Sequence, residues 1–508
     1  MRILLYALLT GAASAFAFEP VGVWLLMPVA FAVLLWLLSQ AQTLRRALLV
    51  GWIFGVGQFV VGLNWIATAF GFQAAMPAWL GWIAVVLLSL YLAVYPALAA
   101  GLAWRIGKDN EIARSFALAG GWAITEWLRA GIFTGFAWNP VGAALVPTPL
   151  LGTTALIGTY GLSALTVLLG AVIWLEIKRK FLPGVAIAFA TALLWLLPSS
   201  PVPETPLLLK PIRVVQPNIG QEQKWRPEFA EEAARKLAQL SQTPGGEHPH
   251  LLLWPEAAVT QPLQDDRAGP ASAFAAFERS RAAQSLQNGE ALLTGGISLQ
   301  SADGQNVSGA TNSVFVIAPG GRALARYDKA HLVPYGEYLP MRALLTPLGL
   351  SRLVPGDTDF SAGPGPRSVE LPNWGKIGIQ VCYEIIFSGH VADKANRPDF
   401  IFNPSNDAWF GRWGPPQHLA QARLRAAEEG LPVVRATPTG ISAVIDGRGH
   451  VVQQIGWRQA GVIDTNLPPP SPQPTLFGRF GNVVPLLLSA LLLLGAIALA
   501  GSRRYRHT

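Results

Sequence analysis

The only cysteine of the chain, Cys382, lies where a run of strand-forming residues meets a helix-forming segment, within residues 378–384. A turn from strand to helix exposes a side chain and points backbone N–H groups at the space beside it, which suits a nucleophile and an oxyanion. A lone cysteine makes no internal disulfide, zinc knuckle or iron–sulfur site. The alternative is a buried thiol that only packs, which is common for free cysteine.

Two further segments hold groups that thiol chemistry requires. Glu256 ends the strand-like run that begins at Leu253, and Lys329 lies in the polar and aromatic segment 327–337, which also holds His331. A thiol with a pKa of about 8.5 is mostly protonated at neutral pH and needs a base, for which Glu256 and His331 are candidates. Taken singly, Glu256 also fits a helix start and Lys329 an exposed surface lysine.

These three segments belong to a part of the chain, residues 205–470, with an α/β pattern. Short apolar runs rich in β-branched residues alternate with polar helical stretches, which predicts a sheet with a buried face. The expected strands lie at 212–216, 251–254, 291–296, 313–317, 377–381, 400–403, 433–436 and 443–446. The expected helices lie at 227–242, 271–286, 384–396 and 416–430.

The rest of the chain is strongly apolar. Of all 508 residues 51% are hydrophobic and only 13% are charged, which excludes a disordered chain and an ordinary soluble enzyme. A membrane-spanning helix needs about 20 apolar residues. Eight segments are candidates, although the first also reads as a cleaved signal peptide: 3–18, 21–38, 47–70, 79–104, 115–133, 158–177, 182–198 and 483–501.

The distribution of charge predicts the topology. Residues 199–482 hold 25 basic and 25 acidic residues, so the net charge of +8 comes entirely from the apolar parts, which argues against nucleic acid as a partner. With the N-terminus inside, the inner segments carry twelve Lys and Arg, and the short outer loops carry only Arg129. The positive-inside rule then places both termini in the cytoplasm and residues 199–482 outside, in a bacterial periplasm.

In order and motif, Glu256, Lys329 and Cys382 resemble the Glu–Lys–Cys triad of the nitrilase superfamily, and residues 403–411 resemble its Asn-rich loop. Seven apolar segments before such a domain and one after it resemble the apolipoprotein N-acyltransferase family within that superfamily. The resemblance implies an α-β-β-α sandwich inserted before the last helix of an eight-helix transmembrane bundle. The expected parts are a bundle (1–198), a catalytic domain (205–470), and a linker with the last helix and a basic tail (471–508).

The resemblance also implies roles for residues. Glu256 becomes the general base in preference to His331, Lys329 the group that stabilises the oxyanion, and Cys382 the nucleophile. Glu337, Glu384 and Tyr383 are expected to support them. Tentative substrate contacts are Trp138, Trp225, Asn403 and Trp409. The histidines show no metal-ligand spacing, so we expect no metal, and no cofactor is expected.

The implied reaction has two steps. Cys382 takes the sn-1 acyl chain of a phospholipid such as phosphatidylethanolamine as a thioester, and the α-amine of a diacylglyceryl-cysteine at an apolipoprotein N-terminus then receives it. The implied enzyme is a monomer of the bacterial inner membrane. Independently, the apolar stretch 341–353 after the lysine motif indicates an arm that touches the bilayer, or else an ordinary core loop.

Two other functions remain open at this point. The same triad on a membrane anchor would suit an amidase that hydrolyses small C–N substrates, although seven or eight helices are many for an anchor. A transporter with an outer sensing domain is the other alternative, but it would be expected to show internal repeats with broken helices, which we do not find in the sequence.

Overall fold

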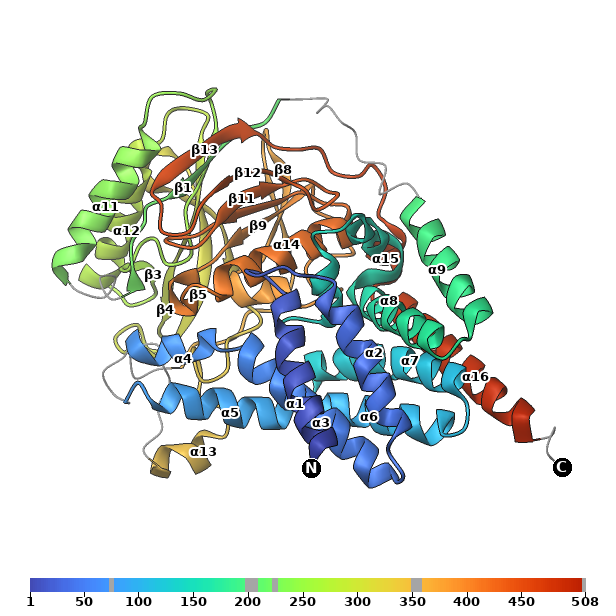
Figure 1. The fold of residues 1–508 in the computed structure, drawn as a ribbon. Coiled ribbons are helices and arrows are strands. Elements are labelled where there is room, and N and C mark those ends of the chain that lie inside the picture. Colours follow the sequence, from blue (N-terminus) through green and yellow to red (C-terminus); the bar gives the residue numbers. More distant parts are fainter. Residues whose placement is uncertain (73–76, 197–208, 222–226, 349–358, 505–508) are drawn as a thin grey trace.

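The structure is a computed structural model, and it describes residues 1–72, 77–196, 209–221, 227–348 and 359–504 (Figure 1). Helices dominate the first of its two parts, with short 3-10 turns between them. They are α1 (Arg2–Ser14), α2 (Leu26–Ser39), α3 (Leu44–Gly62), α4 (Trp65–Ala69), α5 (Leu80–Leu92), α6 (Val94–Gly107), α7 (Glu111–Gly131), α8 (Thr154–Ile177) and α9 (Phe181–Leu196), and α16 (Val483–Arg504) joins them from the end of the chain.

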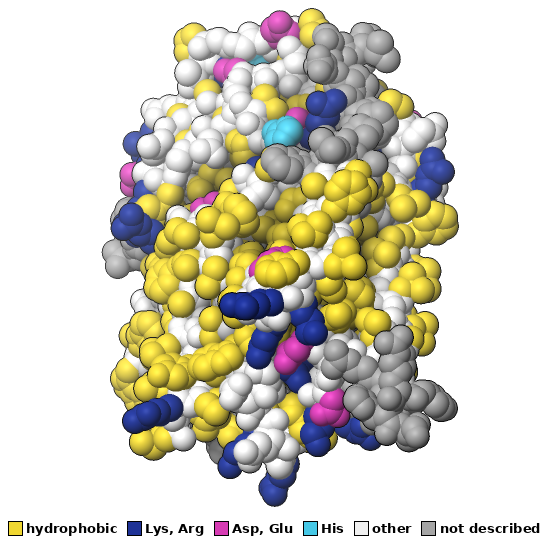
Figure 2. Space-filling model, turned by 45° about the vertical axis from the view of Figure 1, so that its right-hand side comes forward, with side chains coloured by type: hydrophobic (Ala, Val, Ile, Leu, Met, Phe, Trp, Pro, Cys, Tyr) yellow, Lys and Arg dark blue, Asp and Glu magenta, His cyan; other side chains and the backbone are white. Residues whose placement is uncertain are grey.

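Every apolar segment expected from the sequence overlaps at least one of these helices. By length and composition, Leu44–Gly62, Leu80–Gly107, Pro149–Ile177 and Val483–Gly501 are able to cross a membrane. Three apolar helices among the described residues are shorter, at Arg2–Ala17, Leu26–Ser39 and Phe181–Leu193. The chain is therefore a membrane protein with several apolar helices. In Figure 2 hydrophobic side chains cover a broad band of the surface, and Lys and Arg gather in the lower part of this band and beneath it, with a few Asp and Glu among them.

Glycines let the first helix pack closely in this bundle. A Cβ on Gly11 of α1 would lie 1.9 Å from the carbonyl oxygen of Phe54 in α3, and one on Gly57 of α3 would lie 2.3 Å from the carbonyl oxygen of Leu8. Such approaches are typical of helix pairs inside membranes, where small residues form the interface.

Charged residues of α7 hold the loop that follows it. The Glu126 carboxylate accepts hydrogen bonds from Trp122 Nε1 (3.1 Å) and from the backbone N–H of Val141 (2.8 Å). Arg129 donates to the carbonyl oxygen of Trp138 (2.9 Å). Glu126 and Arg129 of α7 thus position the segment between α7 and the turn at 141–145.

Two sheets make up the second part of the molecule. The first has the order β13-β1-β2-β4-β5-β6, with β3 paired to β4, and the second has the order β12-β11-β10-β9-β8-β7. The strands are β1 (Pro211–Gln216), β2 (Leu251–Leu253), β3 (Pro262–Asp265), β4 (Ala291–Gln300), β5 (Gly309–Ile317), β6 (Ala323–Asp328), β7 (Ser368–Leu371), β8 (Gly375–Ile379), β9 (Phe400–Pro404), β10 (Val433–Ala436), β11 (Ser442–Ile445), β12 (Val451–Ile455) and β13 (Gly461–Asn466).

Successive side chains of a strand point to opposite faces of its sheet, so each sheet can pack against the other sheet on one face and against helices on the other. Leu251 and Leu253 of β2 meet Phe400 and Phe402 of β9 in a core between the sheets. Leu252 between them faces the other way, toward helix α11 (Pro227–Ser241), and α12 (Pro270–Ala282) covers the same face. Helix α14 (Gly414–Glu429) lies on the outer face of the second sheet. The result is the expected α-β-β-α sandwich.

One predicted helix is wrong. Residues 384–396 form no α-helix; only a short 3-10 turn, η8 (Cys382–Ile386), follows β8 before irregular chain. Phe387 is extended (φ −86°, ψ 99°), and Gly389 has a φ of +78° with Asn482 packed against it, so the turn η8 does not continue into an α-helix. Strands β3, β6, β7, β12 and β13 are not among those expected from the sequence.

The sandwich rests on the helical part through the loop after α7. Tyr383 donates its hydroxyl to the carbonyl oxygen of Gly135 (3.2 Å), and His331 Nε2 lies 3.2 Å from that of Thr134. On α14, Glu428 accepts from the backbone N–H of Thr159 (2.6 Å), which opens the regular part of α8. The sandwich lies above the helices in Figure 1, so these contacts join the two parts.

Candidate active site

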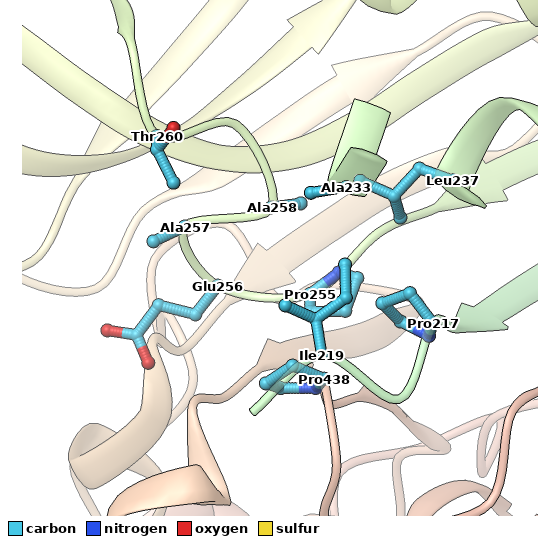
Figure 3. Close-up of a pocket in the computed structure, with 10 residues that line it drawn as sticks. All are labelled: Pro217, Ile219, Ala233, Leu237, Pro255, Glu256, Ala257, Ala258, Thr260 and Pro438. Carbon is cyan, nitrogen blue, oxygen red and sulfur yellow. The ribbon is translucent and has the colours of Figure 1, made fainter. Parts of the chain in front are cut away.

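Glu256 lies at the carboxyl end of β2, which is a central strand between β1 and β4 and parallel to both. Its side chain is 6% exposed, and its Oε1 accepts a hydrogen bond from Asn312 Nδ2 (2.8 Å). A small apolar pocket formed by Pro217, Ile219 and Pro438 lies behind it. Figure 3 shows the Glu256 carboxylate turned away from these three residues.

Lys329 follows the last residue of β6 and is almost fully buried, with 1% exposure. Its Nζ lies 3.0 Å from the Glu337 carboxylate and 3.5 Å from Glu256 Oε1. Burial alone would lower the pKa of Lys329, but the two carboxylates outweigh it and the pKa is raised. Lys329 is therefore a fixed positive charge at neutral pH and is no base.

Asn312 of β5 is a site residue that the sequence analysis did not identify. Its Nδ2 donates to Glu256 Oε1 (2.8 Å) and to Glu337 Oε1 (2.7 Å), and its carbonyl accepts from the backbone N–H of Lys329 (2.9 Å). It therefore holds both carboxylates on either side of the ammonium. The one available signal was a polar run, Thr311-Asn312-Ser313, inside a fully buried strand.

Cys382 begins the turn η8 beyond β8, with a φ of +52°. A residue other than glycine in this region carries strain of about 1–3 kcal/mol, which persists where the surroundings hold it and is frequent at functional sites. The thiol is buried, and burial together with the charge of Glu256 raises its pKa well above the ordinary value, although Lys329 acts in the opposite direction. At neutral pH the resting thiol is protonated.

Glu384 joins the cysteine turn to the lysine segment. Its Oε1 accepts from the backbone N–H groups of Ala330 (2.7 Å) and His331 (3.0 Å), and its Oε2 accepts from that of Val381 (2.7 Å). The Tyr327 hydroxyl donates to the same carboxylate (3.0 Å). Glu384 thus fixes how far Lys329 lies from Cys382, which is a positioning contact.

A buried polar network lies under the cysteine. The carbonyl of Cys382 accepts from His418 Nε2 (3.1 Å) and from Asn403 Nδ2 (3.5 Å). Arg435 in turn donates to Asn403 Oδ1 and to Asp407 Oδ2, both at 2.5 Å. Asn403, predicted as a substrate contact, is fully buried here and holds the backbone of the turn; its contact with substrate stays a prediction.

The three tryptophans predicted as substrate contacts differ in their surroundings. Trp138 is fully buried, donates to Gln417 Oε1 (2.8 Å), and packs against Trp65 and His418, with ring centroids 4.5 and 5.2 Å away. Trp409 is half-buried and meets Phe72 edge to face. Trp225 lies outside the described residues. A substrate contact for each stays a prediction.

The predicted arm is described up to residue 348. It forms α13 (Arg342–Leu345) and a 3-10 turn (Thr346–Leu348), and Met341 and Leu344 are 60% and 67% exposed. In Figure 1 α13 lies below α5, on the side away from the sandwich. Residues 349–353 of the predicted arm lie outside the described residues.

Comparison with known proteins adds the family. The model of the apolipoprotein N-acyltransferase N-terminal domain matches residues 10–172, and that of carbon-nitrogen hydrolases matches residues 212–475. A solved carbon-nitrogen hydrolase from Helicobacter pylori G27 aligns with 51% of this chain and 89% of its own at 16% identity, with a TM-score of 0.35, which is too low to add to the assignment.

Three curated relatives named apolipoprotein N-acyltransferase align over nearly their whole length. The protein from Rhodopseudomonas palustris is 36% identical, covering 96% of this chain and 93% of its own. That from Bradyrhizobium diazoefficiens is 37% identical (99% and 96%), and that from Brucella melitensis is 35% identical (97% and 94%). Because the similarity spans the apolar helices and the sandwich together, the chain belongs to the apolipoprotein N-acyltransferase family.

Proposed function

We propose that this chain moves an acyl chain from the sn-1 position of a phospholipid, phosphatidylethanolamine for example, to the α-amine of the diacylglyceryl-cysteine that begins an apolipoprotein. The family assignment supports the acyl transfer and the lipoprotein acceptor. The observation that carries the proposal is that Tyr383, next to Cys382, is hydrogen-bonded to the loop that leaves α7. This contact places the turn that carries Cys382 beside the loop that follows α7, where the sandwich meets the apolar helices.

In the first step the Cys382 sulfur attacks the ester carbonyl while Glu256 takes the thiol proton. The S–C bond forms, and the negative charge that develops on the carbonyl oxygen is stabilised by the Lys329 ammonium. The C–O bond of the ester then breaks, and Glu256 returns the proton to the departing lysophospholipid oxygen. The products are a Cys382 thioester and a lysophospholipid.

In the second step the neutral α-amine of the acceptor attacks the thioester carbonyl. The N–C bond forms, the C–S bond breaks, and the amine proton passes through Glu256 to the sulfur, which regenerates the protonated thiol. The raised pKa of Cys382 favours this return to the thiol. Glu337, Glu384 and Tyr383 act as positioning residues in both steps, because they hold Lys329, the cysteine turn and the membrane loop.

We further propose a topology in which residues 1–198 and the last helix form eight membrane spans and residues 205–470 face the periplasm. Residues 471–508 comprise the linker, the last span and a basic tail, and both termini lie in the cytoplasm. The gathering of Lys and Arg toward the lower end of the apolar band in Figure 2 supports this orientation. The proposed enzyme acts as a monomer without cofactor.

Mass spectrometry of the intact protein tests the reaction. After incubation with phosphatidylethanolamine that carries distinct chains at sn-1 and sn-2, we expect the mass of the sn-1 acyl group on Cys382, and its loss on addition of a diacylglyceryl peptide with a free amine. Cys382→Ala should carry no acyl group. Rapid turnover of small amides without an acylated intermediate from phospholipid would instead indicate an amidase.

A further inference from the structure

Three potential metal ligands meet where β2 and β4 begin, at the end of the first sheet that lies away from the active site. His250 directly precedes β2 and Glu290 directly precedes β4, and these parallel strands pair with Leu251 opposite Ala291. The two side chains therefore leave neighbouring strands at the same level and on the same face. His248, two residues earlier, completes the group.

The geometry of the three side chains is close to that of a metal site. Their ligand atoms lie within 4.8 Å of one another, with His248 Nδ1 2.7 Å and His250 Nδ1 3.5 Å from Glu290 Oε1. His250 is 3% exposed, and its Nδ1 has no hydrogen-bond partner among the described residues although it points into the group. A buried polar atom without a partner costs about 1–3 kcal/mol, which a bound cation would offset.

Backbone groups fix the carboxylate independently of the imidazoles. Glu290 Oε2 accepts from the N–H of Gln287 (2.8 Å), and Oε1 accepts from that of His250 (3.3 Å). Such support around a ligand is what holds metal-binding side chains in place. Nearby, the charge of Arg213 is offset by Asp464, to which it donates at 2.6 Å, so Glu290 remains the charge that a cation meets.

The His250 ring is buried, and its Nδ1 faces the Glu290 carboxylate at 3.5 Å. The His248 side chain is 41% exposed, which leaves a route from solvent. Two imidazoles and one carboxylate are the ligands of open tetrahedral zinc sites, in which water fills the fourth position. The donor set suits other late first-row divalent ions as well.

We propose that His248, His250 and Glu290 bind one divalent transition-metal ion of the zinc class, which links the beginnings of β2 and β4. The site is separate from the proposed catalytic centre, since Glu256 lies beyond the opposite end of β2. Occupation requires His248 to exchange its hydrogen bond with Glu290 for a bond to the ion of about 2.0–2.1 Å. Nothing in the spacing of these residues along the chain predicts the site, because Glu290 lies forty residues from His250.

The test titrates zinc into the full-length protein in detergent, after removal of any affinity tag and of bound metal by chelator. We expect one zinc per chain, with affinity at least tenfold weaker in His250→Ala and Glu290→Gln. His450→Ala is the matched control, because His450 pairs with Asp446 at 3.5 Å on an exposed surface without a third ligand. It should bind as the unchanged protein does.

Two measurements keep the proposal testable. Should His250→Ala fail to fold, His248→Ala removes a ligand whose ring is already partly exposed. X-ray absorption of the zinc-loaded protein should show nitrogen and oxygen at about 2.0–2.1 Å and no sulfur, and Cys382→Ala should bind zinc unchanged. Three results would each overturn the site: no zinc binding, a zinc affinity of Glu290→Gln and His248→Ala equal to that of the unchanged protein, or a sulfur ligand at about 2.3 Å.

Discussion

Lys329 is shared between Glu337 and the proposed general base, Glu256. Substituting Glu337 by Gln should leave Glu256 as its one charged partner of this pair and draw Lys329 closer to it. The Lys329 ammonium lies 3.0 Å from Glu337 and 3.5 Å from Glu256. With the charge of Glu337 removed, we expect the ammonium to move to a charge-assisted hydrogen bond of about 2.8 Å with Glu256. At an effective dielectric constant of about 20, this shift strengthens the Coulomb attraction by about 1.2 kcal/mol.

The consequence is a weaker base. A gain of about 1.2 kcal/mol makes the Glu256 carboxylate roughly eightfold less able to take the thiol proton. Thioester formation in a single turnover should therefore fall about tenfold.

The assay follows acylated Cys382 by quenched mass spectrometry between pH 4 and 9. Glu370→Gln, the same change on an exposed carboxylate of β7, is the control and should leave rate and profile unchanged. An unchanged rate in Glu337→Gln, or an equal loss of rate in Glu370→Gln, would refute this reasoning.

Three further results are expected. Because the pKa of Cys382 is raised, iodoacetamide should alkylate this thiol at pH 7 at least tenfold more slowly than an exposed cysteine, and the rate should increase as the pH rises above 9. Glu256→Gln removes a charge that raises the pKa of Cys382, so it should speed alkylation while it blocks thioester formation. Lys329→Met removes a charge that lowers this pKa, so it should slow both reactions. Equal effects of the two variants on alkylation would contradict the charges assigned. Tyr383→Phe, which loses the hydrogen bond to the membrane loop, should cost about 0.5–1.5 kcal/mol, seen as a lower melting temperature in detergent. Leu344→Asp should slow acylation by phospholipid vesicles but not by a short soluble ester, whereas Leu324→Asp on β6 should change neither; a loss with both substrates would argue against an arm.

The parts of the fold that sequence patterns predicted are those with a strong local signal. Leu251-Leu252-Leu253 and Phe400-Ile401-Phe402 are buried on both faces, so they are apolar throughout and stand out. Strand β12 has only its last residue buried and carries Gln453 and Gln454, so nothing in its composition marks it. The helix expected at 384–396 does not form. Gly389 packs against Asn482, which is distant in the chain, so this contact could not be read from the local sequence.

The site divides in the same way. The residue types and motifs of Glu256, Lys329 and Cys382 predicted a cluster, and the structure brings them together with Glu337 and Glu384. Asn312 was not predicted, because its role depends on strand β5 facing the lysine segment. His418 was not predicted either, since only the packing of α14 places its ring under the Cys382 carbonyl.

The central proposal is that a fatty acyl chain rests on the Cys382 sulfur between lipid and lipoprotein. The most direct measurement is the mass of the peptide that contains Cys382, after the purified protein has been incubated with natural phospholipids and the reaction has been quenched with acid. The account predicts the added mass of one fatty acyl group, removed by hydroxylamine and absent in Glu256→Gln. An unmodified thiol during active acyl transfer, or an acyl group on another residue, would contradict it.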